Sequence, residues 1–497
     1  MKRPLFAAFA LGAITVAGFA PVGFSPLPMV TLALLFRAWQ RAATPGQAAA
    51  LGFAWGLGFF LTGVSWVYVS LSGFGDMAPP LAALATLLFC AFLALFPALA
   101  GFVFARLRCG STGRDALLAA GSWALAEWLR GWMFTGFPWL ALGYAQTPPS
   151  PLAGYAPVLG VYGVGFVAAL IAATLASGAS RRRMAVTLAV LVGGGLLLRG
   201  VAWTQPSGVP VSVSLLQGNI PLDIKWEPRL ASLSLDTYVD LALRHPAALT
   251  VLPETAIPLF LDDVPRELFA DLTRNGAVLF GVAMRLRQDG SMDRYTNGAV
   301  AVTRRGDGEF DFQTYAKRHL VPFGEFGPPG FAWFFDLVRI PLSDFTAGPP
   351  GQKPLAVAGL MVAPNICYED LFGDEIIEAL PAASVLVNLS NTAWFGDSLA
   401  QPQHLQISRM RAMETGRPSL RATNTGMTAA IAPDGSIIAA LEPFGTGALV
   451  LSVQGYSGTT PFVRYGNVVA VILALAACLP ALRRRRGGRD SESEVYP

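Results

Sequence analysis

The sequence carries little charge and few of the residues that build metal or disulfide sites. Only 14% of its 497 residues are charged, against about 25% in an ordinary soluble domain, while 53% are hydrophobic. It has four cysteines and three histidines, and only one cysteine lies in a polar stretch. We therefore expect no disulfide there, no metal site and no organic cofactor. There is no Walker-type phosphate loop and no basic-aromatic surface, so nucleic acid is not an expected partner.

Apolar residues are concentrated in the first two hundred positions and in one run close to the C-terminus. Because a helix needs about 20 mostly apolar residues to cross about 30 Å of hydrocarbon, such runs predict membrane spans. We predict eight, at residues 4–20, 21–36, 47–71, 81–104, 116–134, 158–176, 184–203 and 462–482. For residues 1–20 the alternative is a cleaved signal peptide, but a second apolar run follows at once, which favours a span.

Basic residues occur in every second connection between these runs. They are Lys2, Arg3, Arg37, Arg41, Arg106, Arg108, Arg114, Arg181, Arg182, Arg183, Arg483, Arg484, Arg485, Arg486 and Arg489. The other short connections hold almost none, and cytoplasmic loops are the ones enriched in lysine and arginine. We therefore expect both termini in the cytoplasm and the polar stretch 205–457, between the last two spans, on the outer side.

Two charged residues lie three positions apart inside the fifth predicted span. Charges at membrane depth are costly and usually pair or line a cavity, so Glu127 and Arg130 are expected to do one or the other. The segment that follows, residues 135–146, is rich in aromatic residues, glycine and proline. It is expected to form either an interfacial belt or a re-entrant piece beside a lipid-accessible pocket.

The polar stretch alternates short β-like runs with helical ones. Predicted strands are 209–216, 249–252, 277–282, 298–303, 355–363, 384–389 and 428–432, and predicted helices are 229–244, 264–274 and 402–415. This alternation is typical of a layered α/β domain and not of an all-β sandwich. Residues 201–207 and 455–460 are expected to be linkers to the flanking spans.

Three reactive side chains follow apolar runs in this stretch: Glu254, Lys317 and Cys367. A cysteine thiol is a weak nucleophile until its proton is removed or its thiolate is stabilised. A buried carboxylate can accept that proton, and an ammonium group can stabilise the oxyanion that forms. Taken singly, the cysteine is more often an inert core residue, the glutamate a helix cap and the lysine a surface charge. Only their order and their neighbours favour catalysis.

Those neighbours resemble known motifs. The segments LPE-T at Glu254, K-R-x-L-V-P-F-G-E from Lys317 and I-C-Y-E-D at Cys367 occur in the order of the Glu-Lys-Cys set of the nitrilase superfamily. Further blocks resemble the apolipoprotein N-acyltransferase family. They are GFPW at 136–139, QGNI at 217–220, KW at 225–226, NLSNTAWFGD at 388–397, QHLQ at 403–406, RMRA at 409–412 and RATNTG at 421–426.

The resemblance implies a nitrilase-like αββα sandwich domain at residues 205–457, inserted between transmembrane helices. A seven-helix region at 1–204 would precede it, and a last helix at 458–483 and a cytoplasmic tail at 484–497 would follow. The expected location is the inner membrane of a bacterium, with the catalytic domain periplasmic and the chain a monomer. The expected partners are a membrane phospholipid as acyl donor and a diacylated apolipoprotein as acceptor.

The same resemblance implies roles for single residues. Glu254 would be the general base and Cys367 the nucleophile that forms a thioester. Lys317, with the backbone N–H after Cys367, would stabilise the oxyanion. Glu325 would orient Lys317 and Glu369 would be positioned near Cys367, or else both would only make structural hydrogen bonds. The supporting and substrate-binding residues that the resemblance implies are Glu325, Glu369, Tyr368, Trp226 and Asn297.

Two apolar segments interrupt the polar stretch, at residues 326–337 (FGPPGFAWFFDL) and at Trp394-Phe395. Exposed apolar patches mark interaction sites, so each is expected either to dip toward the membrane, the first as a lid or arm, or to pack in the core.

Two other functions compete with acyl transfer. One is a membrane-anchored amidase that uses water as its second nucleophile, and the other is a transporter or lipid-binding protein. An amidase that acts on a water-soluble amide would gain nothing from eight membrane spans. A transporter or lipid-binding protein would leave the Glu-Lys-Cys set without a role.

Overall fold

A computed structural model of the chain describes residues 2–221, 228–286, 294–327 and 344–490. It divides into two compact units. The helical unit comprises Met1–Ser65, Ala83–Ala202 and Arg464–Pro497, and the second unit, which contains the sheets, comprises Trp66–Ala82 and Trp203–Val463. The segment 66–82 therefore packs with the sheets although it lies within the apolar N-terminal part of the sequence.

Each of the eight predicted spans coincides with a helix of similar position. The helices are α1 (Lys2–Thr15), α2 (Pro26–Arg41), α3 (Pro45–Gly63), α5 (Pro79–Leu107), α6 (Thr112–Arg130), α7 (Ala156–Ala176), α8 (Arg181–Arg199) and α15 (Val468–Asp490). Local sequence sets where they begin. Before α3, for example, the Thr44 hydroxyl accepts a hydrogen bond from the Gln47 amide at 3.2 Å, and Pro45 occupies the first turn.

Length and apolar composition single out fewer helices than the sequence pattern predicts. Among the described residues, two helices are long and apolar enough to cross a membrane, Pro79–Leu107 and Pro151–Ala176. A third candidate combines Pro45–Gly63 with Trp66–Phe74, two helices that meet at a bend of 51°. Spanning by the remaining helices stays a prediction.

The helical unit packs closely where glycines allow it. A Cβ atom on Gly12 of α1 would lie 1.9 Å from the carbonyl oxygen of Trp55 in α3. A Cβ atom on Gly58 of α3 would in turn lie 2.1 Å from the carbonyl oxygen of Phe9. The two backbones thus approach each other through small residues, a common way for helices to associate where no hydrophobic effect drives them together.

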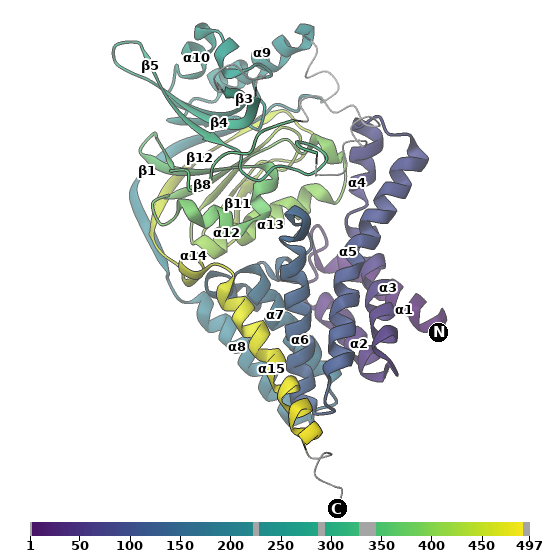
Figure 1. Cartoon of the computed structure of the whole chain (residues 1–497). Helices are drawn as coiled ribbons and strands as arrows, with labels where there is room; N and C mark the ends of the chain where they lie inside the picture. Colours follow the sequence, from purple (N-terminus) through teal and green to yellow (C-terminus); the bar gives the residue numbers. More distant parts are fainter. Residues whose placement is uncertain (1, 222–227, 287–293, 328–343, 491–497) are drawn as a thin grey trace, which may run out of the picture. The chain divides into compact units, whose positions relative to one another are not determined.

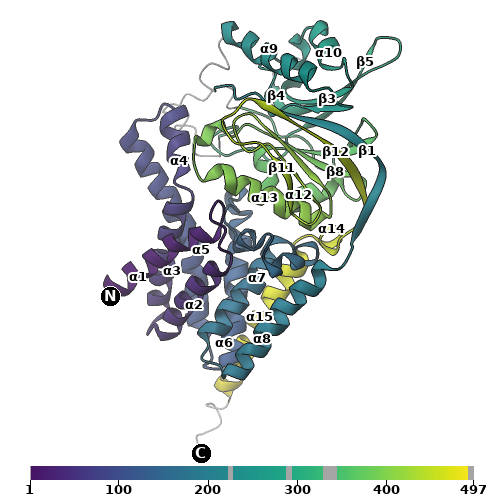
Figure 2. The same ribbon diagram turned by 180° about the vertical axis from the view of Figure 1, so that it is seen from behind.

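The second unit contains a first sheet with the strand order β12-β1-β2-β3-β4-β5. Its strands are β1 (Thr204–Gln217), β2 (Leu249–Val251), β3 (Ala277–Leu286), β4 (Arg294–Arg304), β5 (Phe310–Ala316) and β12 (Gly447–Gly458). The β1–β2 and β2–β3 pairs are parallel, and the other pairs are antiparallel. The strands β1 and β12 run side by side over most of their length (Figure 2).

A second sheet has the order β11-β10-β9-β8-β7-β6. Its strands are β6 (Leu355–Val357), β7 (Leu360–Ile366), β8 (Val385–Ser390), β9 (Ser419–Thr423), β10 (Ala429–Ile431) and β11 (Ile437–Ala440). Parallel pairing requires crossovers, and helices supply them in both sheets. They are α9 (Pro228–Arg244), α10 (Arg266–Leu272), α12 (Gly373–Ile376) and α13 (Ala400–Thr415).

The sheets stack face to face, and helices cover their outer faces (Figure 1). Alternation along β3 shows how: Ala277 and Leu279 belong to the core between the sheets, whereas Val278 and Phe280 belong to the core under α9 and α10. On the other side, α12 and α13 pack against the second sheet through two smaller cores. The predicted layered α/β domain is confirmed, in the form of two mixed sheets between helices.

Three details of the prediction were wrong. The predicted linkers 201–207 and 455–460 largely form the ends of β1 and β12, which pair from Thr204 with Gly458 onward. The single predicted strand 355–363 is the hairpin of β6 and β7, because Ala358 and Gly359 form a turn with φ angles of 50° and 79°. The prediction also missed β5, β9, β11 and β12.

Candidate active site

Cys367 lies where β7 ends and the short 3₁₀ helix η7 (Cys367–Leu371) begins. Its φ angle is 52°, in a region that costs of order 1–3 kcal/mol for a residue other than glycine. The side chain is 8% exposed and packs at the edge of the core between the sheets. A strained turn thus places the sulfur at the carboxyl end of β7.

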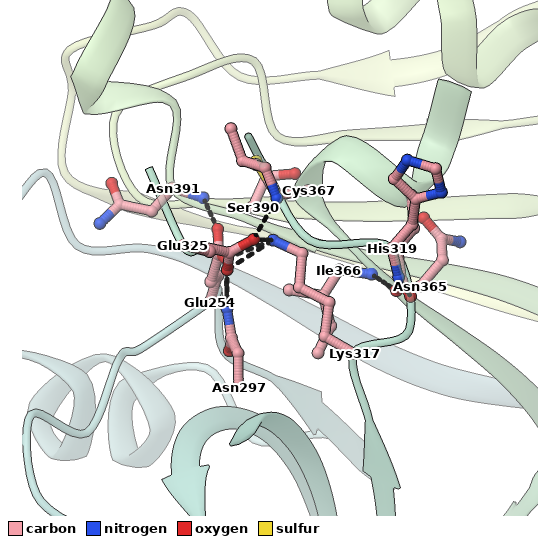
Figure 3. Close-up of polar contacts among 12 residues, drawn as sticks. Glu254, Asn297, Lys317, His319, Glu325, Asn365, Ile366, Cys367, Ser390 and Asn391 are labelled. Atoms are coloured by element: carbon pink, nitrogen blue, oxygen red, sulfur yellow. Dashed lines mark hydrogen bonds and ion pairs between the residues drawn. The ribbon is translucent and has the colours of Figure 1, made fainter. Parts of the chain in front are cut away.

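Lys317 follows β5 directly and is 1% exposed. Its Nζ atom lies 2.8 Å from Glu325 Oε2 and 3.4 Å from Glu254 Oε1. Its backbone amide donates to the carbonyl oxygen of Asn297 at 2.8 Å, which fixes the main chain beside β4. The ammonium group is therefore buried and shared between two carboxylates (Figure 3).

Glu254 comes three residues after the end of β2 and is held on both oxygens. Its Oε1 atom accepts a hydrogen bond from Asn297 Nδ2 at 2.8 Å, and its Oε2 atom accepts one from the Asn391 amide at 2.9 Å. Asn297 Nδ2 also donates to Glu325 Oε1 at 2.9 Å. The side chain of Asn297 therefore bridges the two glutamates on either side of Lys317 (Figure 3).

Burial and charge set the protonation of these groups. Burial opposes the charged form of Lys317, but the carboxylates of Glu325 and Glu254 outweigh it and hold the lysine pKa above its ordinary value. Burial raises the pKa of the Cys367 thiol, and the charge of Glu254 raises it further. The charge of Lys317 lowers this pKa, but by less than the other two effects raise it. The thiol is therefore protonated at neutral pH in the resting site. It becomes a good nucleophile only when a base accepts its proton during the reaction.

Glu369 ties the turn at Cys367 to the loop at Lys317. Its Oε2 atom accepts from the Ile366 amide at 2.6 Å, and its Oε1 atom accepts from the Arg318 amide at 2.7 Å. The Tyr315 hydroxyl donates to the same Oε1 atom at 2.9 Å. Burial raises the pKa of Glu369 to about 6, although these donors oppose the shift. The carboxylate orients the backbone on both sides of the site.

The predicted residues thus fall into three groups. Glu254, Lys317 and Cys367 come together with Glu325 and Asn297, and Glu369 lies behind them. Tyr368 is buried beside Phe372, with ring centroids 5.2 Å apart. Trp226 lies outside the described residues, as does most of the apolar segment 326–337.

Trp394 and Phe395 pack against the segment of the second unit that comes from the apolar N-terminal part. Phe395 lies 4.5 Å from Trp66 of α4 (Trp66–Val69), and Trp394 lies 6.0 Å from Phe74, measured between ring centroids. The Ser70 hydroxyl donates to the carbonyl oxygen of Trp394 at 2.7 Å. The two aromatic residues therefore anchor this segment to the sheets.

In the helical unit, Glu127 and Arg130 are buried and bind the backbone of the segment 135–146. Glu127 Oε1 accepts from the Leu142 amide at 2.9 Å, and Arg130 Nη1 donates to the carbonyl oxygen of Trp139 at 2.7 Å. Both residues also line a small, mostly apolar cavity. They add side-chain partners to the backbone of an irregular segment, in which buried polar groups need hydrogen bonds.

Sequence reasoning gave no role to a buried polar cluster beside Cys367. Its members are Asn365, Asp370, Asn388, Asn391, His404, Ser408 and Arg421. Polar residues usually indicate exposed positions, so composition alone does not find them. Several of them lie in the sequence blocks 388–397, 403–406 and 421–426, which resemble a known family. That resemblance was the one feature of the sequence that could have pointed to them. Among the described residues, no group of three or more His, Cys, Asp or Glu side chains could hold a metal ion.

Comparison with known proteins shows which families this sequence resembles. Residues 11–174 match the sequence profile described as the apolipoprotein N-acyltransferase N-terminal domain, and residues 212–461 match that of carbon-nitrogen hydrolase. The apolipoprotein N-acyltransferase of Nitrosomonas europaea is 50% identical, covering 97% of this chain and 98% of the relative. The one from Ralstonia nicotianae is 47% identical, covering 96% and 92%. The one from Methylococcus capsulatus is 41% identical, covering 97% and 96%.

Proposed function

Because the chain belongs to the apolipoprotein N-acyltransferase family and is therefore an acyltransferase, we propose a two-step transfer through a thioester at Cys367. The acyl donor is a membrane phospholipid, and the acceptor is the N-terminal α-amine of a diacylglyceryl-modified apolipoprotein. The observation that carries the proposal is the buried ammonium of Lys317, held by Glu254 and Glu325 beside the thiol of Cys367.

In the first step the sulfur of Cys367 attacks the ester carbonyl of the donor, and Glu254 accepts the thiol proton. Lys317 and the backbone N–H after Cys367 stabilise the oxyanion, because both are donors fixed before the reaction begins. The tetrahedral intermediate then collapses. The C–O bond breaks, the lysophospholipid oxygen takes the proton from Glu254, and a thioester remains on the sulfur.

In the second step the α-amine of the acceptor attacks the thioester carbonyl. The amine loses a proton to Glu254, the C–S bond breaks, and the proton returns to the sulfur. An amide forms on the lipoprotein, and the free thiol of Cys367 is restored. Each step uses the same base and the same oxyanion donors, so one small site is sufficient for both.

Membrane placement is part of the proposal. The alternation of basic residues supports eight spans, cytoplasmic termini and a periplasmic catalytic domain at 205–457, in the inner membrane of a bacterium. A membrane-impermeant maleimide tests it in intact cells, with Cys109 replaced by serine and Cys367 by alanine, so that neither native cysteine is labelled. We expect Asp434→Cys, on an exposed turn, to be labelled and Ser180→Cys to be protected. Protection of the cysteine at 434 would reverse the topology.

The function is tested with purified protein, a phospholipid labelled in its acyl chain and a synthetic diacylated lipopeptide. We expect the label in an amide on the lipopeptide, and none with Cys367→Ala. The amidase alternative predicts release of free fatty acid or ammonia without labelled lipopeptide. A lipid-binding protein without catalysis predicts neither product. Either of these two results contradicts the proposal.

A further inference from the structure

The small cavity of the helical unit lies where α3, α5 and α6 meet, and its volume is about 10 Å³. Five aromatic side chains make up most of its lining. Three of the lining residues carry polar atoms that concern us here: Trp55 on α3, and Trp123 and Glu127 on α6. These three side chains are 2%, 4% and 7% exposed, so the polar atoms at the cavity are shielded from bulk water.

One polar atom of each of these side chains has no hydrogen-bond partner within the part of the chain that the structure describes. The atoms are Nε1 of Trp55, Nε1 of Trp123 and Oε2 of Glu127. The other oxygen of Glu127 accepts from the Leu142 amide at 2.9 Å. A buried polar atom without a partner is costly, and folded proteins rarely leave one in that state. Three such atoms at one cavity therefore indicate a shared partner.

The positions of the three residues allow one group to reach all of them. Trp123 and Glu127 are one turn apart on α6, so they lie on the same face of that helix. The ring of Trp55 meets the ring of Trp123 edge to face, with centroids 5.2 Å apart and an angle of 86° between the planes. An indole N–H only donates, and an ionised carboxylate only accepts. The shared partner must therefore accept two hydrogen bonds and donate at least one.

The size of the cavity limits what this partner can be. A water molecule needs about 10–15 Å³ of cavity volume and two to four polar partners. The cavity offers about 10 Å³ and three polar atoms. It has no room for a lipid head group or an acyl chain. A cavity of this size with only apolar walls would stay dry, but the polar atoms of Trp55, Trp123 and Glu127 favour water.

We propose that this cavity is a binding site for a single water molecule. The water accepts hydrogen bonds from Nε1 of Trp55 and of Trp123, and it donates one to Oε2 of Glu127. It links α3 to α6 and, through the other oxygen of Glu127, to the backbone of Leu142. Both oxygens of the buried carboxylate are then bonded. The inference concerns the helical unit and does not depend on acyl transfer through Cys367.

Nuclear Overhauser transfer from water to the indole N–H protons tests the proposal. The measurement uses the full chain in detergent, deuterated and labelled with ¹⁵N-tryptophan, and Trp55→Phe and Trp123→Phe identify the two signals. We expect the indole protons of Trp55 and Trp123 to show cross-peaks at the water frequency. A rotating-frame experiment separates these cross-peaks from chemical exchange by their sign. The residues that line the cavity have no hydroxyl group whose proton would mimic water.

Trp39 is the matched control within the same protein. It is fully buried, and its Nε1 atom also has no hydrogen-bond partner among the residues that the structure describes. It does not line the cavity, so its indole proton should show no cross-peak with water. The comparison separates a water bound at this site from water that reaches every buried indole.

Glu127→Gln tests the acceptor. The amide keeps the size of the side chain, and its oxygen can still accept from Leu142. Its NH₂ group then faces the cavity, where three donors meet one water molecule that accepts two hydrogen bonds. We expect both cross-peaks to be lost, and thermal unfolding checks that the variant is folded.

The wild-type spectrum decides the proposal even if this variant does not fold. The absence of a cross-peak at Trp55 or at Trp123 overturns the three-point site, and so does a cross-peak of equal strength at Trp39. Unchanged cross-peaks in a folded Glu127→Gln protein would show that the carboxylate does not hold the water, which also overturns the proposal.

Discussion

Replacing Lys317 by methionine removes the buried ammonium and keeps the shape of the side chain. At an effective dielectric constant of about 20, charges 2.8 Å apart attract by about 6 kcal/mol before the cost of burying them. After that cost, breaking a buried ion pair typically destabilises a protein by about 3–5 kcal/mol. We therefore expect Lys317→Met to be less stable by about this amount. The carboxylates of Glu254 and Glu325 are then left buried without their shared cation.

The same change also removes an oxyanion donor. Loss of one such donor typically costs about 10²–10³ in rate, or about 2.7–4 kcal/mol. The two effects can be separated, because Glu325 belongs to the ion pair but not to the reacting atoms. In Lys317→Met/Glu325→Gln only one of the two carboxylates that pair with Lys317 remains. We expect this double variant to recover much of the stability and none of the rate.

The assay measures the rate of acylation of Cys367 in a single turnover, beside the free energy of unfolding in detergent. If Lys317→Met acylates at the wild-type rate, the oxyanion role assigned to the lysine is wrong. If the double variant regains activity together with stability, Lys317 acts only by holding the site together.

Two further predictions concern buried positions. Glu369 has a pKa raised from 4.5 to about 6, so the folded state keeps its proton over a range in which the unfolded chain loses it. The protonated carboxyl therefore favours folding below about pH 4.5, and this contribution of about 2 kcal/mol is lost as the pH rises to about 6. Urea titrations across this range should show a flatter pH dependence in Glu369→Gln, and an unchanged slope would contradict the assignment. Gly12→Ala should lower the unfolding temperature of the protein in detergent, because the new Cβ would lie 1.9 Å from the carbonyl oxygen of Trp55. Gly113→Ala is its control, because a Cβ there meets open space, and an equal effect of the two changes would show that the α1–α3 contact is not close.

The parts of the fold that the sequence predicts are those with a simple apolar pattern. The strand β3 is a continuous run of apolar residues because both of its faces are buried, and such a run is visible without any structure. The strand β9 was missed because it carries Arg421, whose charge is satisfied only by partners from distant segments. The hairpin of β6 and β7 was read as one strand because Ala358 makes its turn look apolar.

The same distinction holds for the candidate site. Glu254, Lys317 and Cys367 could be predicted as candidates because short motifs surround them and each follows a strand. The positions of Asn388 and His404 could not be predicted. Their contacts join β8 to η7 and α13 to β9, and a local sequence pattern does not reveal hydrogen bonds between segments that meet only in the folded chain.

The central claim is that an acyl chain passes through Cys367. Its most direct test is the intact mass of the wild-type protein and of Cys367→Ala after incubation with phospholipid, with and without hydroxylamine. The account predicts an added acyl mass that hydroxylamine removes, on the wild type alone. An adduct on both proteins, or N-acylation of a lipopeptide by Cys367→Ala, would contradict it.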